Sequence, residues 1–384
     1  MNSKVKVAVL FSFVLNISCN SIDRLYINYG TVKKQFESAN SDVAMIFFDR
    51  KGNMYPDYPI DDSFLRASDS RLEQYYENDS VTYNAICKQY NLKPDIHNLS
   101  VTNSPLQEAL ISRKASQLNY SEKELFFIIH GYNEHPSKPD DDSSSMGMKK
   151  TKEWIESHYP NRFLFVEVYW DGLSRQNGNK ILLYNPVYIW DNAQASASNT
   201  GFELRRLFSK LNKKKKYVLT HSLGASVITT ALFNVEKLKN AQLNELKMKF
   251  ENPVYNSPSQ EFHIGMIAPA IPGENTFLEY HNRTIKGKNI RTTDSNYFFI
   301  TGFNSYDPVN SKGYSLSRFL GSTTLGCKRN ELEKTRRIFM NEDFIFDYED
   351  FSYFDGNRKQ RSHSWLKYIE NNFHFKNFAE KLIE

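Results

Sequence analysis

The sequence has 384 residues, of which 40% are hydrophobic and 24% charged, so it can bury one large core or two modest ones and is not disordered over most of its length. The formal charge of +5 is too small and too evenly spread for a nucleic-acid-binding protein. The cysteines Cys19, Cys87 and Cys327 form no CxxC pair, which argues against a metal framework or a disulfide-dense scaffold.

The first eighteen residues have the layout of an export signal. Two lysines precede the apolar run 7–15, and small or polar residues follow up to Cys19. The run is too short to cross a bilayer. The segment Leu-Asn-Ile-Ser-Cys that ends at Cys19 resembles a bacterial lipobox, although Asn16 stands where lipoboxes usually have Leu, Val or Ile. The resemblance implies removal of residues 1–18 and acylation of Cys19.

This N-terminus predicts an exported protein that a lipid anchors to the membrane of a bacterial cell envelope. Simple secretion and an uncleaved apolar segment are the two alternatives. In an oxidising compartment Cys87 and Cys327 could pair, but the sequence does not show that they meet in space. The favoured interpretation is two unrelated buried thiols.

The region 19–120 combines a predicted hairpin with predicted helices. A β-hairpin is predicted from the apolar residues 43–48, the turn 49–52 and residues 54–58. This hairpin could add antiparallel strands to the main sheet. Residues 62–120 have polar, helical patterns, and they fit a cap, a small separate domain or a decoration. We place the domain boundary near residue 120, so that residues 121–384 form the main domain.

Beyond residue 120, short apolar runs that end at turn residues alternate with helical patterns. The runs are residues 125–129, 163–170, 217–219, 264–267 and 297–301. The helical patterns include residues 148–159, 204–211 and 225–236. Continuous apolar runs are typical of strands that are buried on both sides of a sheet. The alternation therefore predicts an α/β fold with a mostly parallel, open sheet and helices on both faces.

Ser222 is the candidate nucleophile. It stands in the sequence Thr-His-Ser-Leu-Gly at 220–224, directly after an apolar strand and before a helical run. A sharp strand-to-helix turn would lift its hydroxyl above the sheet and aim the following amides at a carbonyl group. Gly224 lets such a turn close, whereas Thr220 stands where glycine is usual. The pentapeptide alone is weak evidence, so its position in the chain matters.

Two backbone amides are candidate donors to an oxyanion. The strand 125–129 ends at the turn His-Gly-Tyr-Asn, 130–133, which a parallel sheet brings to the same edge as Ser222. An oxyanion hole needs two donors near the developing negative charge, and the amides of Tyr132 and Leu223 are the natural pair. The alternative is that the turn merely ends a strand.

A histidine and a carboxylate that could activate the serine follow later in the chain. Asp307 comes after the strand 297–301, and His363 precedes a helical stretch near residue 366. A serine hydroxyl needs a base that takes its proton and an acid that orients the base. The order Ser222, Asp307, His363 is the one used by hydrolases with a nucleophile elbow.

Other residues compete for these roles. His281 and His374 are the alternative bases, and the second lies among phenylalanines that are typical of a packing helix. Asp294 and Asp355 are the alternative acids. The two histidines that adjoin the turns, His130 and His221, are interpreted as structural residues, because a neighbour of the serine on the elbow points away from it.

The motifs at 130–133, 169–171, 220–224 and 306–309 resemble a little-characterised bacterial branch of the α/β-hydrolase superfamily. The resemblance covers residues 120–384. It implies a Ser222–His363–Asp307 triad, an oxyanion hole at Tyr132 and Leu223, and hydrolysis of an ester or related acyl bond without a metal or an organic cofactor. The expected substrate is a small-molecule or lipid ester, with no nucleic acid as partner.

Two questions stay open at the level of sequence. The stretch 172–201 carries an aromatic cluster that forms either a lid or acyl-binding wall or an ordinary helix that covers the sheet. The same triad would also serve an acyltransferase, and the fold could have been kept as a non-enzymatic binding scaffold in the envelope.

Overall fold

The computed structural model describes residues 43–57, 71–97, 99, 104–132, 144–172, 186–233, 260–274, 276–277, 296–311, 323–340, 344–354 and 356–384, with the backbone alone at 144–145 and 186–192. The predicted export signal and Cys19 lie outside these residues. Within the described ranges, no helix is both long and apolar enough to span a bilayer.

Seven strands of the described chain form one sheet, in which every neighbouring pair is parallel. In spatial order they are β1 (Val43–Phe48), β3 (Phe163–Trp170), β2 (Glu124–Ile129), β4 (Lys215–His221), β5 (Glu261–Ile267), β6 (Asn296–Phe303) and β7 (Ile345–Asp350). All five predicted runs are strands of this sheet. The predicted α/β fold with an open parallel sheet is therefore confirmed.

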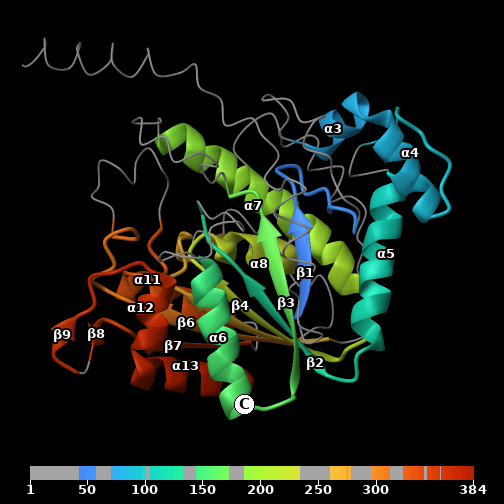
Figure 1. The fold of residues 1–384 in the computed structure, drawn as a ribbon. Helices are drawn as coiled ribbons and strands as arrows, with labels where there is room; N and C mark the ends of the chain where they lie inside the picture. Colours follow the sequence, from blue (N-terminus) through green and yellow to red (C-terminus); the bar gives the residue numbers. More distant parts are fainter. Residues whose placement is uncertain are drawn as a thin grey trace, which may run out of the picture.

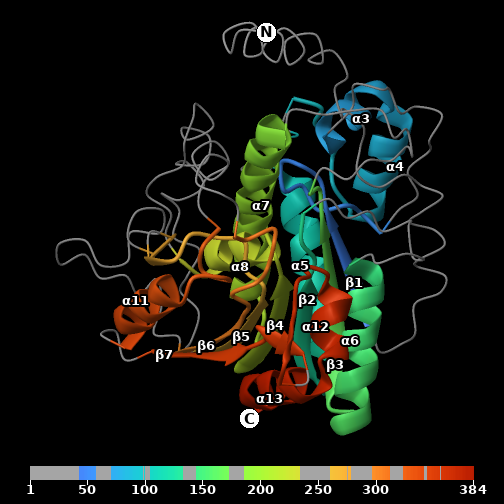
Figure 2. The same cartoon turned by 90° about the vertical axis from the view of Figure 1, so that its left-hand side faces the viewer.

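Helices cover both faces of the sheet (Figures 1 and 2). One face carries α5 (Pro105–Tyr120), α7 (Pro186–Ser209), α8 (Gly224–Leu232) and α11 (Arg329–Met340). The other face carries α6 (Ser144–His158), α12 (Trp365–Glu370) and α13 (Asn372–Ile383). The connections explain this division, because right-handed crossovers that run in opposite directions along a parallel sheet place their helices on opposite faces. Helix α7 packs on α5 and α8, whereas α12 packs on α6 and α13.

Two smaller groups complete the described chain. Helices α3 (Leu72–Asn78) and α4 (Ser80–Gln89) pack on each other. The backbone amide of Leu72 donates to the Asp49 carboxylate at 2.7 Å, which fixes the start of α3 to the turn after β1. Strands β8 (Tyr353–Phe354) and β9 (Arg358–Lys359) form a short antiparallel pair ahead of α12.

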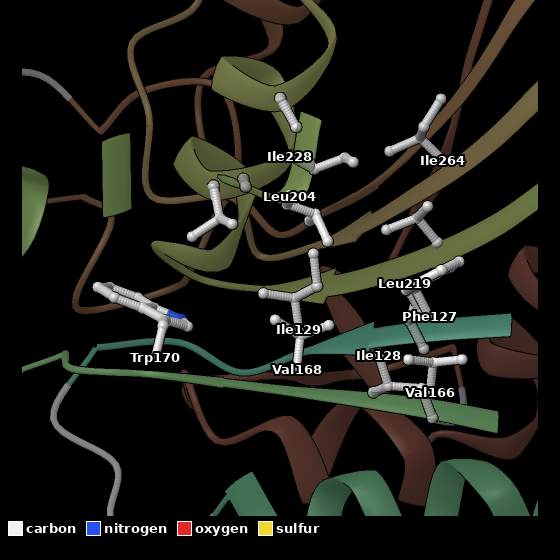
Figure 3. Packing of buried hydrophobic residues seen from close by; sticks show 14 of the residues in the cluster. Phe127, Ile128, Ile129, Val166, Val168, Trp170, Leu204, Leu219, Ile228 and Ile264 are labelled. Atoms are coloured by element: carbon white, nitrogen blue, oxygen red, sulfur yellow. The ribbon is translucent and has the colours of Figure 1, made fainter. Parts of the chain in front are cut away.

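The core forms because the central strands are covered on both sides. Phe127 and Ile129 of β2 are fully buried, and the ring of Phe127 meets that of Phe208 on α7 edge to face. Figure 3 shows Leu204 of α7 and Ile228 of α8 gathered over the same part of the sheet. Burial of an apolar side chain of this size contributes about 1.5–3 kcal/mol, so the uninterrupted apolar runs hold the sheet between its helices.

The hairpin predicted at 43–58 is present only as a short antiparallel turn, and the expectation that it adds antiparallel strands to the main sheet is wrong. Strand β1 runs parallel to β3, and the returning chain makes only one antiparallel bridge, between Phe48 and Met54. The side chain of Gln107 on α5 both donates to the Met54 carbonyl (3.1 Å) and accepts from its amide (2.8 Å). The Met54 amide and carbonyl therefore face Gln107. The neighbouring Asn53 carbonyl and Tyr55 amide bond to the Asp49 amide and the Phe47 carbonyl, at 2.9 Å each.

The rest of the N-terminal region agrees with its predicted helical character. Helices α3, α4 and α5 lie within residues 62–120. Because β1 is an edge strand of the main sheet, at least residues 43–48 belong to that sheet. The domain boundary near residue 120 stays a prediction.

Two further predictions fall partly outside the described residues. Residues 173–185 of the aromatic stretch are not described, and α7 occupies the remainder. The choice between a lid and a covering helix therefore stays open. Cys87 and Cys327 are both free, buried thiols, as the favoured interpretation expects.

One buried lysine lies near the amino ends of the strands, whereas the candidate site lies at their carboxyl ends. Lys216, near the start of β4, is completely buried. Its ammonium group donates to the Lys213 carbonyl and lies 5.3 Å from the ring centre of Phe262. Burial lowers the pKa of Lys216 to about 7, because desolvation disfavours the charged form.

Candidate active site

The carboxyl ends of β2 and β4 define the place where a site is expected in this sheet. These strands are neighbours, but the chain leaves β2 through α6 towards β3 and leaves β4 through α8 towards β5. Connections that diverge in this way open a crevice outside the strand ends, where open α/β sheets bind their ligands. Ser222 follows β4 directly and therefore lies at this crevice.

Ser222 is held in a tight strand-to-helix turn. Its φ angle is +53°, a left-handed conformation that is uncommon outside glycine. Its amide donates to the Ile267 carbonyl (3.0 Å), and its carbonyl accepts from the Ala270 amide (3.0 Å). Helix α8 begins at Gly224, where an added Cβ would lie 2.6 Å from the His130 carbonyl oxygen. The turn therefore needs glycine at position 224 and matches the predicted nucleophile elbow.

The structure brings Ser222, His363 and Asp307 together in one hydrogen-bonded line. The Nε2 atom of His363 lies 2.8 Å from the Ser222 hydroxyl oxygen, and its Nδ1 atom lies 2.7 Å from Oδ2 of Asp307. An ionised carboxylate only accepts hydrogen bonds, so Nδ1 carries the proton and Nε2 is left to accept from the serine. This tautomer is the one that lets an imidazole act as a general base.

Asp307 is a buried carboxylate with both oxygens occupied. Oδ1 accepts from the amides of Val309 (2.9 Å) and Asn310 (3.0 Å), and Oδ2 accepts from His363 and from the Tyr368 hydroxyl at 3.0 Å. Burial alone raises the pKa of Asp307, but the His363 imidazole and these hydrogen bonds outweigh it and lower the pKa below its ordinary value. Asp307 is therefore an anion at neutral pH.

Tyr368 is a site residue that the sequence prediction missed. It lies on α12, is completely buried, and bonds to the same Asp307 oxygen as His363. The helical stretch after His363 is visible in the sequence. The contact is not, because it depends on how α12 packs against the turn after β6.

His221 holds the loop that carries His363. Its Nε2 group donates to the His363 carbonyl oxygen at 2.8 Å, and its ring stacks on Trp365 with 5.3 Å between the ring centres. Burial, followed by the neighbouring His363, lowers the pKa of His221 to about 3. His221 is thus neutral and cannot serve as the base, in line with its interpretation as a structural residue.

His130 has a comparable role at the end of β2. Its Nε2 atom accepts from the Trp170 amide at 3.0 Å, so its Nδ1 carries the proton and donates to the Gly131 carbonyl at 2.7 Å. The indole of Trp170 in turn donates to the His130 carbonyl at 2.9 Å. Because both of its ring nitrogens are hydrogen-bonded to backbone groups, His130 fixes the ends of β2 and β3 relative to each other.

Of the competing residues, the structure describes His374, and it is not brought to Ser222. His374 lies on α13, where its Nδ1 pairs with Glu349 at 2.7 Å. His281, Asp294 and Asp355 lie outside the described residues. In the described part of the chain, no group of three or more His, Cys, Asp or Glu side chains could hold a metal ion.

The two turns that carry the predicted oxyanion donors lie at the serine. Leu223 follows Ser222 at the N-terminal end of α8. Gly131, which precedes Tyr132, packs so closely that an added Cβ would lie 2.9 Å from the Cβ of Ser222. The turns after β2 and β4 therefore meet at the serine. The roles of the two amides as donors belong to the proposal below.

Comparisons with known proteins do not assign a family. No protein-family model matches the chain, and no curated protein does. A solved structure with some similarity is a poly(3-hydroxybutyrate) depolymerase from Bordetella parapertussis, which is 12% identical over 68% of this chain and 85% of that chain, with a TM-score of 0.32. The fold assignment therefore depends on the sheet described above, and the chemistry depends on the site.

Proposed function

We propose that the protein is a serine hydrolase of the α/β-hydrolase type that cleaves a carboxylic ester or a related acyl bond. The observation that carries the proposal is the position of His363, whose two ring nitrogens join the hydroxyl of Ser222 to the carboxylate of Asp307 at 2.8 and 2.7 Å. A nucleophile, a base and an orienting acid in this order are the parts that covalent acyl transfer needs.

The reaction proceeds in two halves. Nε2 of His363 takes the hydroxyl proton as the Ser222 oxygen attacks the acyl carbonyl, while Nδ1 keeps its hydrogen bond to Asp307. The amides of Leu223 and Tyr132 donate to the oxyanion of the tetrahedral intermediate. His363 then returns the proton to the departing alcohol and leaves an acyl-enzyme. Water, activated by the same nitrogen, releases the acid and restores Ser222. These steps use no metal or organic cofactor.

Labelling with a fluorophosphonate tests the proposal, because this probe reacts with a serine that a base activates and an oxyanion hole faces. The full chain, purified in detergent, is compared with Ser222→Ala and with the matched control Ser226→Ala, which removes a hydroxyl from the next turn of α8. Labelling is expected in the wild type and in the control, and it should be lost in Ser222→Ala.

A folded wild type that stays unlabelled in several detergents would overturn the hydrolase and favour a binding scaffold. Equal labelling of Ser222→Ala would place the reactive serine elsewhere. Once labelling is established, a series of esters with different acyl chains identifies the substrate, and adding alcohols as acceptors separates hydrolysis from acyl transfer.

We also propose that Cys19 is acylated and anchors the enzyme in a bacterial envelope. The support is the charged, apolar and lipobox-like order of residues 1–19. Cells fed with radioactive palmitate should label the wild type and the control Cys327→Ser but not Cys19→Ser. Label that persists in Cys19→Ser would contradict the anchor without affecting the proposed chemistry.

A further inference from the structure

Tyr368 contacts Asp307, the acid of the site. Its hydroxyl lies 3.0 Å from Oδ2 of Asp307, the oxygen that also accepts from Nδ1 of His363 at 2.7 Å. Two donors therefore share one carboxylate oxygen. Tyr368 and Asp307 are completely buried, and the side chain of His363 is 16% exposed. In such surroundings each hydrogen bond changes how much negative charge is available to the other.

The direction of the proton in this contact follows from its neighbours. The side-chain amide of Asn304 donates to the Tyr368 oxygen at 3.2 Å and to the Gln360 carbonyl at 2.9 Å. An amide nitrogen cannot accept, and an ionised carboxylate cannot donate. The Tyr368 hydroxyl therefore accepts from Asn304 and donates to Asp307. Burial, reinforced by Asp307, raises the pKa of Tyr368 well above its ordinary value, so the phenol keeps its proton.

We propose that Tyr368 is a positioning residue that regulates how strongly His363 binds a proton, acting through the carboxylate of Asp307. Its effect on turnover rests on the proposed hydrolase function, but its effect on His363 protonation does not. Tyr368 thereby extends the line of Ser222, His363 and Asp307 by one further member that never touches the substrate.

The sign of the effect follows from electrostatics. The hydroxyl proton of Tyr368 points at Asp307 and places a partial positive charge on the side of the carboxylate that faces the imidazolium. Without this donor, Asp307 stabilises protonated His363 more strongly, and the imidazole should protonate at higher pH. Among the described residues, the titratable groups that face His363 are Asp307 and His221, and His221 stays neutral above about pH 3.

The first test is Tyr368→Phe, which keeps the ring and removes the hydroxyl. The acidic limb of kcat/KM against pH should move to higher pH, because the Asp307 carboxylate then stabilises protonated His363 more strongly. Tyr75→Phe is the matched control, since Tyr75 is also buried and donates to a carboxylate, that of Asp79, at 2.9 Å. Its pH profile should not move.

The second readout needs no activity. Histidine ring signals of the full chain are followed by NMR against pH, and the His363 signal is assigned as the one missing from His363→Gln. In Tyr368→Phe its titration midpoint should rise, whereas Tyr75→Phe should leave it in place. An unchanged midpoint in folded Tyr368→Phe would overturn the proposal. A shifted midpoint in a protein without hydrolase activity would support it and reject the proposed function instead.

A third variant keeps the test sharp if Tyr368→Phe fails to fold. 3-Fluorotyrosine at position 368 is nearly the same size as tyrosine but has a more acidic hydroxyl, so it donates more strongly to Asp307. The His363 midpoint should then move to lower pH, opposite to the phenylalanine variant. A shift to higher pH, or none, would contradict the proposal.

Discussion

Two buried aspartates follow strands of the same sheet and occupy similar turns, yet only one contacts a histidine. Asp49, after β1, accepts from the amides of Lys51, Asn53 and Leu72 and from the side chain of Asn53. Asp307, after β6, accepts four hydrogen bonds, two from turn amides and two from His363 and Tyr368. The Asp49 carboxylate therefore connects parts of the backbone, whereas the Asp307 carboxylate also binds the His363 imidazole.

The environments of the two aspartates shift their pKa values in opposite directions. Burial dominates at Asp49 and raises its pKa, because its hydrogen bonds do not fully compensate for the lost water. At Asp307 burial acts in the same sense, but the imidazole and the hydrogen bonds prevail and lower the pKa. A turn that binds a carboxylate therefore does not by itself make a catalytic acid. In the proposed mechanism, the catalytic role of Asp307 comes from the histidine that faces it.

Asp307→Asn tests this comparison with the largest expected effect. An amide cannot satisfy His363 Nδ1–H and the turn amides at once, so the imidazole adopts the wrong tautomer. We expect kcat for a reactive ester to fall about 1,000- to 10,000-fold. Steady-state kinetics check this, with circular dichroism as the control for folding. A loss smaller than ten-fold would remove Asp307 from the site.

The same change at the other turn should affect stability alone. In Asp49→Asn either orientation of the amide places its NH2 group against backbone donors, which we expect to lower the free energy of unfolding by about 1–3 kcal/mol. Urea titration measures this loss, and kcat of the folded variant should match the wild type. A large fall in kcat would show that the two aspartates are not separate in function.

His221→Phe asks how much the support of His363 matters. Phenylalanine keeps the stacking on Trp365 but loses the bond to the His363 carbonyl. We expect kcat to fall about ten-fold, as for one lost buried hydrogen bond, while the acidic limb of kcat/KM stays in place because His221 is already neutral. Movement of that limb would show that His221 itself titrates in the reaction.

The pH dependence of stability should show the smallest effect, but the two variants should change in opposite directions. A folded-state pKa below the unfolded value makes the contribution of Asp307 disappear as pH falls, whereas the raised pKa of Asp49 favours the folded state as pH falls. Between pH 5 and pH 3, the stability gap between wild type and Asp307→Asn should narrow, and the gap to Asp49→Asn should widen. Each changes by at most about 1.4 kcal/mol per pH unit. Equal trends would contradict the assignment.

The sequence predicts those parts of the molecule that depend on local pattern. Five inner strands are visible as continuous apolar runs, because both of their faces are buried. The edge strand β7 was missed, since half of its residues are charged and Ile345 is 58% exposed. The pairing of β1 in the main sheet was predicted incorrectly because its partner is β3, a parallel strand far along the chain that local pattern does not reveal.

The candidate site divides in the same way. Ser222, Asp307 and His363 could be found because each stands beside a strand end or a helix start that the pattern reveals. Tyr368 and the loop-holding contact of His221 could not, because both depend on where α12 and the His363 loop come to rest.

The buried Lys216 has a consequence for calorimetry. Its pKa of about 7 in the folded protein, against 10.5 for an ordinary lysine, means that near pH 8–9 the folding chain gives up almost one proton at this position. Stability should therefore rise with pH from about 7 to about 10. The released proton is taken up by the buffer, so the heat of unfolding should differ between Tris and phosphate by about the difference in their ionisation enthalpies.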